Sequence, residues 1–441
     1  MTTAYWSPNQ AAVAQQRKGT FTVPNGVGNT YMATMNGKTV SYSSVSGDTA
    51  ALAATGLFNL LNVATGIAPE FLEITWTNPS DGVLLATATV PGTPFANVPG
   101  TDKGLVFSTG NGLAGGITTT DPVANASPSD VNDAQNWLRF TPPAPGVRQL
   151  PQIGDDVEVR NSSIPMLWNL DQLATTRFNT YTRWQDMVGD IGLPENNPNG
   201  YKEWRATYFK FSGPSGSVPS GGLVMILGQG QTGSGPSRER YDAGSQPVTL
   251  TILAAGPPTD EYGVRFLGVH TANTFKLLGN VSLGIAMLPG EITNLASCSV
   301  DGNARLGIGA GVTWTAASTL TILSGEVALS SAPATLTISN GARVIVQKDE
   351  LTWATVTAQG GSTMTWLAGG TITTLTMTTG STLDKSQDLR SLTITNATID
   401  GDTCIVDDPL NAIVWTNGAT VKQRVNSGPF RFTGSRTVRV I

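Results

Sequence analysis

The sequence has little charge, cysteine and histidine. Only 13% of its 441 residues are charged, and 26 Lys and Arg against 31 Asp and Glu give a net charge of −5. With no basic run, the chain lacks the electrostatic footprint of a nucleic-acid-binding protein. Its two cysteines, Cys298 and Cys404, lie more than a hundred residues apart and cannot form a disulfide framework or a four-cysteine metal site. We expect both to be small buried hydrophobic residues.

Long apolar segments are also missing. The longest runs from Leu223 to Leu227, well below the roughly 18 residues of a membrane-spanning helix, so no membrane insertion is expected. The first twenty residues contain no apolar core, so we expect no signal peptide and synthesis as a soluble cytosolic protein. The stretch from Gly230 to Ser237 has the outline of a phosphate loop, but Pro236 stands where that loop requires lysine. We therefore expect no cofactor.

Threonine, glycine and proline are abundant instead. The chain contains 59 Thr, 50 Gly and 26 Pro, and 39% of its residues are hydrophobic. β-Branched residues and turn formers in these numbers favour many short strands over a helical bundle, and the apolar content argues against disorder.

Residues 1–100 are predicted to form a small α+β domain with its core at 28–97. Alternating residues around Asn36-Gly37 predict a hairpin with a type I′ turn, and residues 49–62 have helical spacing, with Asp48 as the expected N-cap. Further alternation predicts strands at 72–76 and 83–90. The order ββαββ predicts one sheet covered by one helix.

Residues 101–150 are predicted to be an irregular linker or docking segment. Gly, Pro, Asn and Asp are frequent there, and the only expected regular element is a short helical turn at 129–138.

The most informative feature is a set of recurring triplets: Leu320-Thr321-Ile322, Leu336-Thr337-Ile338, Val356-Thr357-Ala358, Leu375-Thr376-Met377 and Leu392-Thr393-Ile394. Their starts are 16, 20, 19 and 17 residues apart. Short strands that return at this interval are typical of a parallel β-solenoid, whose coils stack and share a core. We predict a right-handed parallel β-helix, with the handedness taken from the general rule for parallel crossovers.

The β-helix is expected to occupy residues 151–425, with loop insertions and a C-terminal tail at 426–441. Less regular strands are predicted upstream at 157–160, 206–211, 222–227, 248–253, 264–270, 275–286 and 292–300. The alternative, tandem antiparallel β-sandwiches, fits the interval near 18 residues less well.

Candidate catalytic residues are few. The single histidine, His270, falls in an apolar strand pattern and is expected to be a core or interface residue. Glycoside hydrolysis needs two carboxyl groups, for which the candidates are Asp400, Asp402, Asp407 and Asp408. Their Gly- and Pro-rich surroundings favour a structural role in turns, and they match no metal-binding loop. Trp314, Trp353, Trp366 and Trp415 are expected to belong to the core.

Three segments of the sequence carry a resemblance to known proteins. The motifs "NTYMATMNGKTVSYSS", "GDTAALAATGLFNLLN" and "PEFLEITWTN", in the region from Tyr31 to Phe95, look like a small domain of structural proteins of tailed bacteriophages. Asp133 to Ser163, with "DAQNWLRF" and "PQIGDDVEVRNSS", resembles the segment that precedes β-helical regions, and Ile191 to Phe211 is similar to phage-associated proteins of this layout. The resemblance implies a virion component, assembled in the host cytoplasm, and supplies no catalytic residue.

We therefore expect a non-enzymatic virion protein attached to the capsid surface as a decoration or short spike. Its expected partners are the major capsid protein, or second a tail protein, and further copies of itself, with a trimer favoured. The alternative is a tail spike or fibre that binds or depolymerises host surface polysaccharide.

Overall fold

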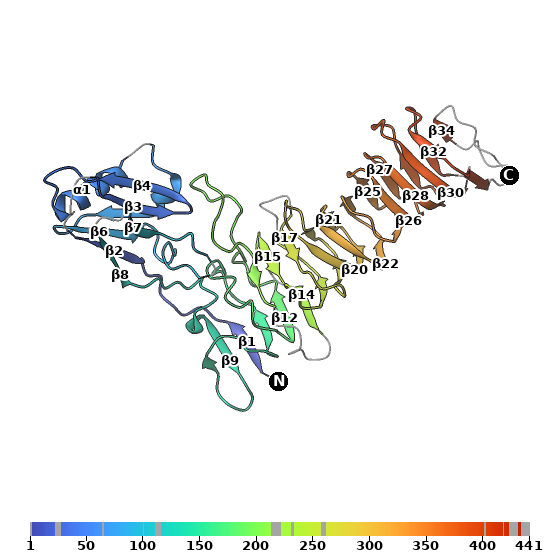
Figure 1. The fold of residues 1–441 in the computed structure, drawn as a ribbon. Coiled ribbons are helices and arrows are strands. Elements are labelled where there is room, and N and C mark those ends of the chain that lie inside the picture. The colour runs from blue at the N-terminus through green and yellow to red at the C-terminus, as the bar shows by residue number, and fades with distance from the viewer. Residues whose placement is uncertain are drawn as a thin grey trace.

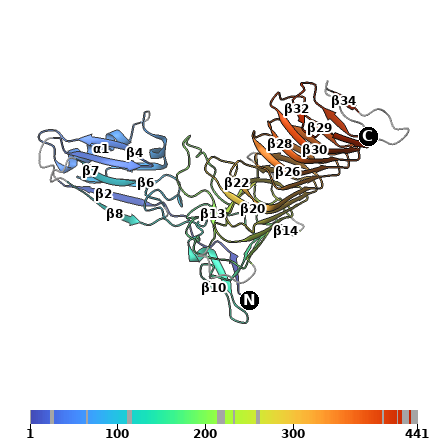
Figure 2. The same cartoon turned by 45° about the vertical axis from the view of Figure 1, so that its right-hand side comes forward.

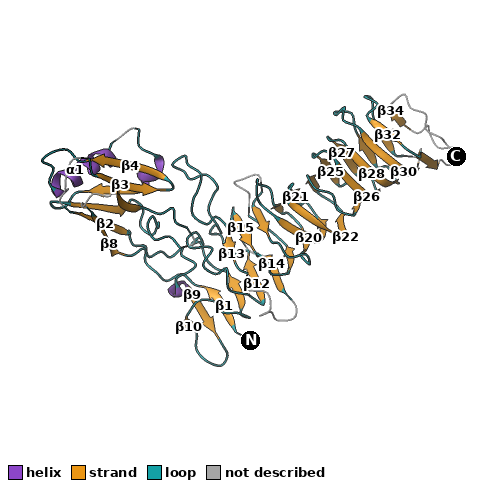
Figure 3. Cartoon of the chain, viewed as in Figure 1, coloured by secondary structure: helices purple, strands orange, loops and turns teal. Residues whose placement is uncertain are grey.

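The molecule is elongated, with an N-terminal lobe at one end and a β-solenoid that extends toward the C-terminus (Figure 1). This computed structural model describes residues 2–22, 28–63, 66–99, 101–110, 116–212, 222–230, 233–256, 262–400, 403–417, 419–422 and 431–433. Strands make up 46% of the chain and helices 5%. The helices drawn in Figure 3 all lie toward the N-terminus, and the described part of the solenoid consists of strands and loops.

The solenoid makes about 11 turns, and each turn contributes strands to two parallel sheets. The first sheet contains, in spatial order, β10 (Val147–Arg148), β9 (Trp137–Phe140), β1 (Thr3–Trp6), β11 (Asp156–Val159), β12 (Thr180–Trp184), β14 (Leu223–Gln229), β16 (Val248–Ile252), β18 (Thr274–Leu278), β20 (Thr293–Asp301), β22 (Val312–Ile322), β24 (Thr335–Ile338), β26 (Leu351–Ala358), β28 (Gly370–Met377), β30 (Leu392–Asp400) and β32 (Ile413–Trp415), with β33 (Ala419–Lys422) also paired to β30.

The second sheet follows the same order along the solenoid. It contains β13 (Phe209–Lys210), β15 (Glu239–Asp242), β17 (Val264–Leu267), β19 (Ser282–Ile285), β21 (Arg305–Ile308), β23 (Glu326–Leu329), β25 (Arg343–Val346), β27 (Thr363–Trp366), β29 (Thr382–Asp384), β31 (Ile405–Asp407) and β34 (Arg431–Thr433). From β11 onward the pairs are parallel, which confirms the predicted solenoid and shows that the antiparallel sandwich alternative is wrong.

Register partners build the interior of the solenoid. In the first sheet Leu320, Leu336, Val356 and Leu375 lie in one column and are completely buried. In the second sheet Leu306, Val327, Val344 and Met364 form the facing column. Burying a side chain of this size stabilises the fold by about 1.5–3 kcal/mol. Because the buried side chains of one coil pack on those of the next, each coil is stabilised mainly by its neighbours. Trp353 and Trp366 are buried here as predicted, with ring centroids 5.4 Å apart.

Threonines form two outward columns on the first sheet. The intervening Thr of each triplet, at 321, 337, 357 and 376, stacks on the next, and so do the residues that precede the triplets, Thr319, Thr335, Thr355 and Thr374. Neighbouring members of a column are separated by the strand spacing of about 4.8 Å. The columns give this face an uncharged surface of methyl and hydroxyl groups.

The fifth triplet does not occupy the position equivalent to that of the other four. Leu392-Thr393-Ile394 pairs with residues 370–372, and Ala397-Thr398-Ile399 takes the equivalent place on Leu375-Thr376-Met377. The reason is that β30 is long and contains two similar segments, "LTI" and "ATI", one after the other. The similar sequence therefore identified the coil but not which part of β30 pairs with Leu375-Thr376-Met377.

The N-terminal lobe has two antiparallel sheets where one was predicted. One contains β5 (Ile74–Thr77), β6 (Val83–Ala88), β2 (Gln16–Phe21) and β8 (Ile117–Val123), and the other contains β4 (Lys38–Ser43), β3 (Thr30–Met35) and β7 (Val106–Gly110). Side chains from both sheets and from α1 (Ala50–Leu61) share one core. The predicted hairpin is confirmed, with positive φ at Asn36 and Gly37.

Local contacts explain how α1 begins and why it tolerates a glycine. Thr49, and not Asp48, is the N-cap: its side chain accepts a hydrogen bond from the Leu52 N–H. Asp48 instead accepts from the Val45 N–H and the Tyr42 hydroxyl. The Tyr42 ring lies against Gly56, where a Cβ atom would be 2.4 Å from it, so the glycine that weakens the helix permits its packing on β4.

The strands also cross the predicted domain boundaries. β1 joins the first solenoid sheet rather than the N-terminal domain, and β7 and β8, from the predicted linker, complete the lobe. At the other end β34, in the predicted tail, continues the second sheet. These pairings join segments far apart in sequence, which local patterns do not record. The only regular helical element at 129–138 is η2 (Ala134–Asn136).

A loop of the solenoid joins the two parts, as the views in Figures 1 and 2 show from two sides. Tyr201 and Trp204, from the loop between β12 and β13, belong to the core of the lobe. Beside them, the buried Arg205 donates to Glu203 at 2.8 Å and to Glu73, at the end of η1 (Pro69–Glu73), also at 2.8 Å. Its guanidinium also donates to the Pro94 carbonyl at 3.0 Å.

This junction is buried, and one guanidinium faces two carboxylates. Burial opposes the charge of Arg205, but the charges of Glu73 and Glu203 outweigh it and raise the pKa of the guanidinium. Burial likewise opposes ionisation of Glu203, and Arg205 nevertheless lowers the pKa of that carboxyl. Removal of one member would leave a buried charge without its partner, so the network stabilises the junction only when it is complete.

Truncation of a core column should destabilise the solenoid far more than truncation of a threonine column. Leu336→Ala should reduce the free energy of unfolding by about 2–5 kcal/mol because it leaves a cavity between Leu320 and Val356. The neighbouring Thr337→Ala, on the outer face, should change it by about 0.5 kcal/mol. Chemical denaturation followed by circular dichroism measures both values. Equal losses would contradict the assignment of the two faces.

Removal of Arg205 should loosen the junction. Arg205→Met leaves Glu73 and Glu203 buried without their cation and should cost about 3–5 kcal/mol, whereas Arg160→Met, at an exposed pair with Glu158, should cost at most about 1 kcal/mol. Thermal unfolding and limited proteolysis between lobe and solenoid measure the loss.

The pH dependence distinguishes this explanation from simple loss of packing. In the native protein the lowered pKa of Glu203 stabilises the fold above its unfolded-state pKa of about 4.5, and this contribution is lost in acid. In the variant the Glu203 carboxyl, which has lost the cation that lowers its pKa, protonates more readily, and acid therefore reduces the cost of burying it. The difference between the two proteins should therefore shrink from pH 7 to pH 4, and a constant difference would contradict the electrostatic explanation.

Candidate functional site

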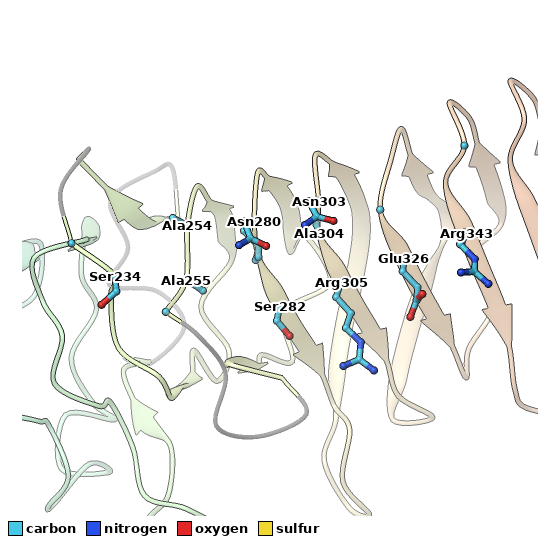
Figure 4. A pocket seen from close by; sticks show the side chains of 15 residues that line it. Ser234, Ala254, Ala255, Asn280, Ser282, Asn303, Ala304, Arg305, Glu326 and Arg343 are labelled. Carbon is cyan, nitrogen blue, oxygen red and sulfur yellow. The ribbon is translucent and has the colours of Figure 1, made fainter.

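A groove of about 830 Å³ lies along one corner of the solenoid (Figure 4). It crosses successive coils where the chain turns into β19, β21, β23 and β25. One end is bordered by Gly233, Ser234 and the stretch from Ala254 to Gly256, which belong to the loops around β15 and β16. The glycine-rich segment that resembled a phosphate loop thus contributes to the border of this groove, although Gln231 and Thr232 lie outside the described residues.

Small residues keep the floor of the groove low. A Cβ atom on Gly325 would lie 2.4 Å from the Ala304 carbonyl oxygen, and one on Gly256 would lie 1.9 Å from the Pro236 carbonyl oxygen. Gly325 also has a φ of +93°, a conformation that L residues rarely adopt. Larger residues therefore do not fit here, and a ligand can approach the backbone closely.

Polar side chains form a column along the groove. Ser282, Arg305, Glu326 and Arg343 are register partners in four successive strands of the second sheet. Arg305 and Arg343 are exposed and Glu326 is half-buried between them. Asn280 and Asn303, two residues before Ser282 and Arg305, add two carboxamides (Figure 4). The column therefore alternates cation, anion and cation at intervals of about 4.8 Å.

A second, smaller hollow of about 110 Å³ adjoins the groove, because Arg305 and Glu326 line both. Its aromatic side chain is Tyr262, which packs on Gly284 and Gly307, where a Cβ atom would lie 3.0 and 2.4 Å from the tyrosine. The Arg305 guanidinium lies over this ring, 5.4 Å from its centroid. The stacking holds the arginine at the boundary between the two hollows.

The polar groups that line the two hollows include several hydrogen-bond donors. Glu326 is the only carboxylate among the described residues that line the two hollows, and no histidine or cysteine lines them. Glycoside hydrolysis uses two carboxyl groups that face each other across the bond to be cleaved. Guanidinium, carboxamide and hydroxyl groups instead donate hydrogen bonds to the oxygens of a bound molecule.

The predicted acidic residues lie elsewhere. Asp400 ends β30, Asp402 is outside the described residues, and Asp407 ends β31, where it is the register partner of Asp384. Asp408 is buried, and its carboxylate accepts hydrogen bonds from the N–H groups of Ala412 and Ile413 at 2.7 and 2.9 Å. Neither hollow is lined by any of these aspartates. Across the described ranges, no three His, Cys, Asp or Glu side chains gather in a way that suits a metal ion.

His270 lies in a turn, and the two cysteines lie in the core. His270 was predicted in a strand, but β17 ends at Leu267, and the half-exposed imidazole accepts at Nδ1 from the Ala272 N–H in a turn. Glycine and asparagine around it end the apolar alternation. Both cysteines are buried as predicted, and burial raises the pKa of the Cys298 thiol to about 12.

The residues of the groove carry no motif. Arg305, Glu326 and Arg343 are 21 and 17 residues apart, and only the register of the solenoid brings them together. One sequence feature marks this region of each coil: a Gly-Asn pair shortly before a strand, as in Gly279-Asn280 and Gly302-Asn303. This pair locates the corner of the coil but does not indicate that the corner binds anything.

The chain matches none of the protein-family models, curated proteins or solved structures with which it was compared. Among the described helices, none has both the length and the apolar character required to traverse a membrane.

The structural role of Asp408 can be tested directly. Asp408→Ala removes the acceptor of two buried N–H groups and should reduce the free energy of unfolding by about 2 kcal/mol. Asp408→Asn, which retains an acceptor oxygen, should recover part of this loss. Thermal denaturation measures both, and an alanine variant as stable as the native protein would contradict the turn-stabilising role.

Proposed function

We propose that the protein is a non-enzymatic structural component of a bacteriophage virion, attached to the capsid surface as a decoration or short spike. The observation that carries the proposal is a rigid body with a separate lobe at one end: one continuous core runs through the coils, and a buried ionic network joins them to the lobe. Eleven strands at about 4.8 Å give the second sheet a length of roughly 50 Å. The resemblance to phage structural proteins supports the same function.

The lobe is the proposed attachment point. Several of its large apolar side chains are unusually exposed, and α1 presents two of them, Leu52 and Leu60, which are 52% and 43% exposed. Val45, Val63, Leu72 and Val90 are further exposed apolar residues of the lobe. Contiguous exposed apolar surface marks protein interaction sites, and we propose that these side chains contribute to such a surface. The proposed partner is the major capsid protein, with a tail protein as the second possibility.

The proposal includes a symmetric homo-oligomer, with a trimer favoured. The outer threonine columns are free of charge, and the end coils of a solenoid expose unpaired strand edges unless another chain or segment covers them. Light scattering at micromolar concentration tests this part of the proposal, and a monomer would contradict it.

A second candidate function is that of a tail spike or fibre that binds host surface polysaccharide. The groove favours it, because an open polar channel across several coils suits a chain-like ligand. The single carboxylate among the described residues of the groove argues for binding without depolymerisation.

Attachment to the virion can be measured by adding purified protein to particles produced without its gene. The native protein should bind to the heads, as seen by immunogold electron microscopy, whereas Leu52→Glu/Leu60→Glu should bind poorly because it places charge in an apolar contact. Leu389→Glu is the matched control, since Leu389 is 74% exposed on the solenoid, and it should bind normally. Labelled tails would favour the spike, and absence from the particle would refute the virion proposal.

A further inference from the structure

We infer that the groove binds an acidic polysaccharide in which charged and neutral sugars alternate, with carboxylates on Arg305 and Arg343. The inference rests on the second candidate function, the binding of host polysaccharide, and specifies the class of ligand. It stands on the size of the groove, on the alternation of charge along it, and on the hydrogen-bonding groups beside it.

The dimensions of the groove suit several sugar units. Its volume of about 830 Å³ exceeds what one sugar fills, and its lining extends across the coils from Gly256 to Arg343. The glycine floor lets the ring of a sugar lie close to the backbone. The smaller hollow beside Tyr262 receives substituents from the side of the chain.

The arrangement of charge selects the pattern of the ligand. Arg305 and Arg343 are two coils apart, or roughly 10 Å, which is comparable with the length of a disaccharide. Glu326, midway between them, repels a carboxylate on the intervening sugar and accepts hydrogen bonds from hydroxyl groups there. A polysaccharide with a carboxylate on every second sugar can pair with both arginines and present hydroxyl groups to Glu326. A polysaccharide with a carboxylate on every sugar would place one of these carboxylates against Glu326.

Two of these charged groups have no competing partner among the described residues. Within the described residues, neither Glu326 nor Arg343 forms an ion pair or a side-chain hydrogen bond, so neither has to be released before a ligand binds. Ser282 at the end of the column, and Asn280 and Asn303 beside it, donate to sugar hydroxyl and ring oxygens (Figure 4). A nucleic acid fits less well, because its uniformly spaced phosphates would meet Glu326 and the net charge of −5 opposes a polyanion.

The test is isothermal titration of the full-length protein with three probes of equal length. These are hyaluronan oligosaccharides with alternating acid, oligogalacturonate with acid on every sugar, and neutral cello-oligosaccharides. The native protein should bind the first, and binding should weaken as salt is raised. Equal binding of the neutral probe, or no binding of the alternating one, would overturn the inference.

Three variants locate the site and test the charge pattern. Arg343→Gln should weaken binding of the alternating probe about tenfold, whereas Lys276→Gln, which removes an exposed charge from the first sheet, should leave it unchanged. Glu326→Gln should gain binding of oligogalacturonate, because the repulsion is removed. Loss of binding in the lysine variant, or no gain in the glutamine variant at 326, would contradict the assigned roles.

These outcomes are independent of where the protein is located. A protein that is found on virions but binds only neutral glycans would refute the acidic ligand and leave the virion proposal intact. A protein that binds the alternating probe but is absent from particles would refute the virion proposal and leave the site intact.

Discussion

The parallel register of successive coils determines where every side chain of the solenoid points. A residue that faces inward in one strand has inward-facing partners in the strands before and after it, as Leu336 does between Leu320 and Val356. No coil can bury its apolar face alone, so stability is shared between neighbours and the body resists bending. The same register also aligns residues that face outward.

The outer columns therefore extend over several coils with one chemical character each. On the first sheet the repeated residue is threonine, which packs well in a strand and leaves an uncharged surface. On the second sheet Arg305, Glu326 and Arg343 occupy one column and alternate in sign. A solenoid thus converts a spacing of about twenty residues in the sequence into a linear array, which is the geometry required to recognise a polymer.

The sequence was informative where the structure is periodic and local. The recurrence of Leu-Thr-Ile indicated the coils because inward and outward positions alternate within every strand, and the Asn36-Gly37 turn identified its hairpin. It failed where pairing is distant: nothing near Thr3–Trp6 indicates that β1 lies beside β11, and the second segment of β30 resembles its first. The groove was missed for the same reason, since Arg305 and Glu326 become neighbours only through the register. The acidic residues singled out instead stand in turns, where Asp408 satisfies backbone N–H groups.

The junction has a different physical basis from the solenoid. In a chain with so few charges, Arg205, Glu73 and Glu203 are buried together, although a buried ion pair adds little stability over apolar packing. Its value lies in geometry, because a guanidinium that donates to two carboxylates and a carbonyl permits only one arrangement of the elements that carry them. Tyr201 and Trp204 add apolar packing at the same junction. The groove is therefore held in a fixed direction relative to the exposed apolar residues of the lobe, such as Leu52 and Leu60, which the proposed role as a projecting protein requires.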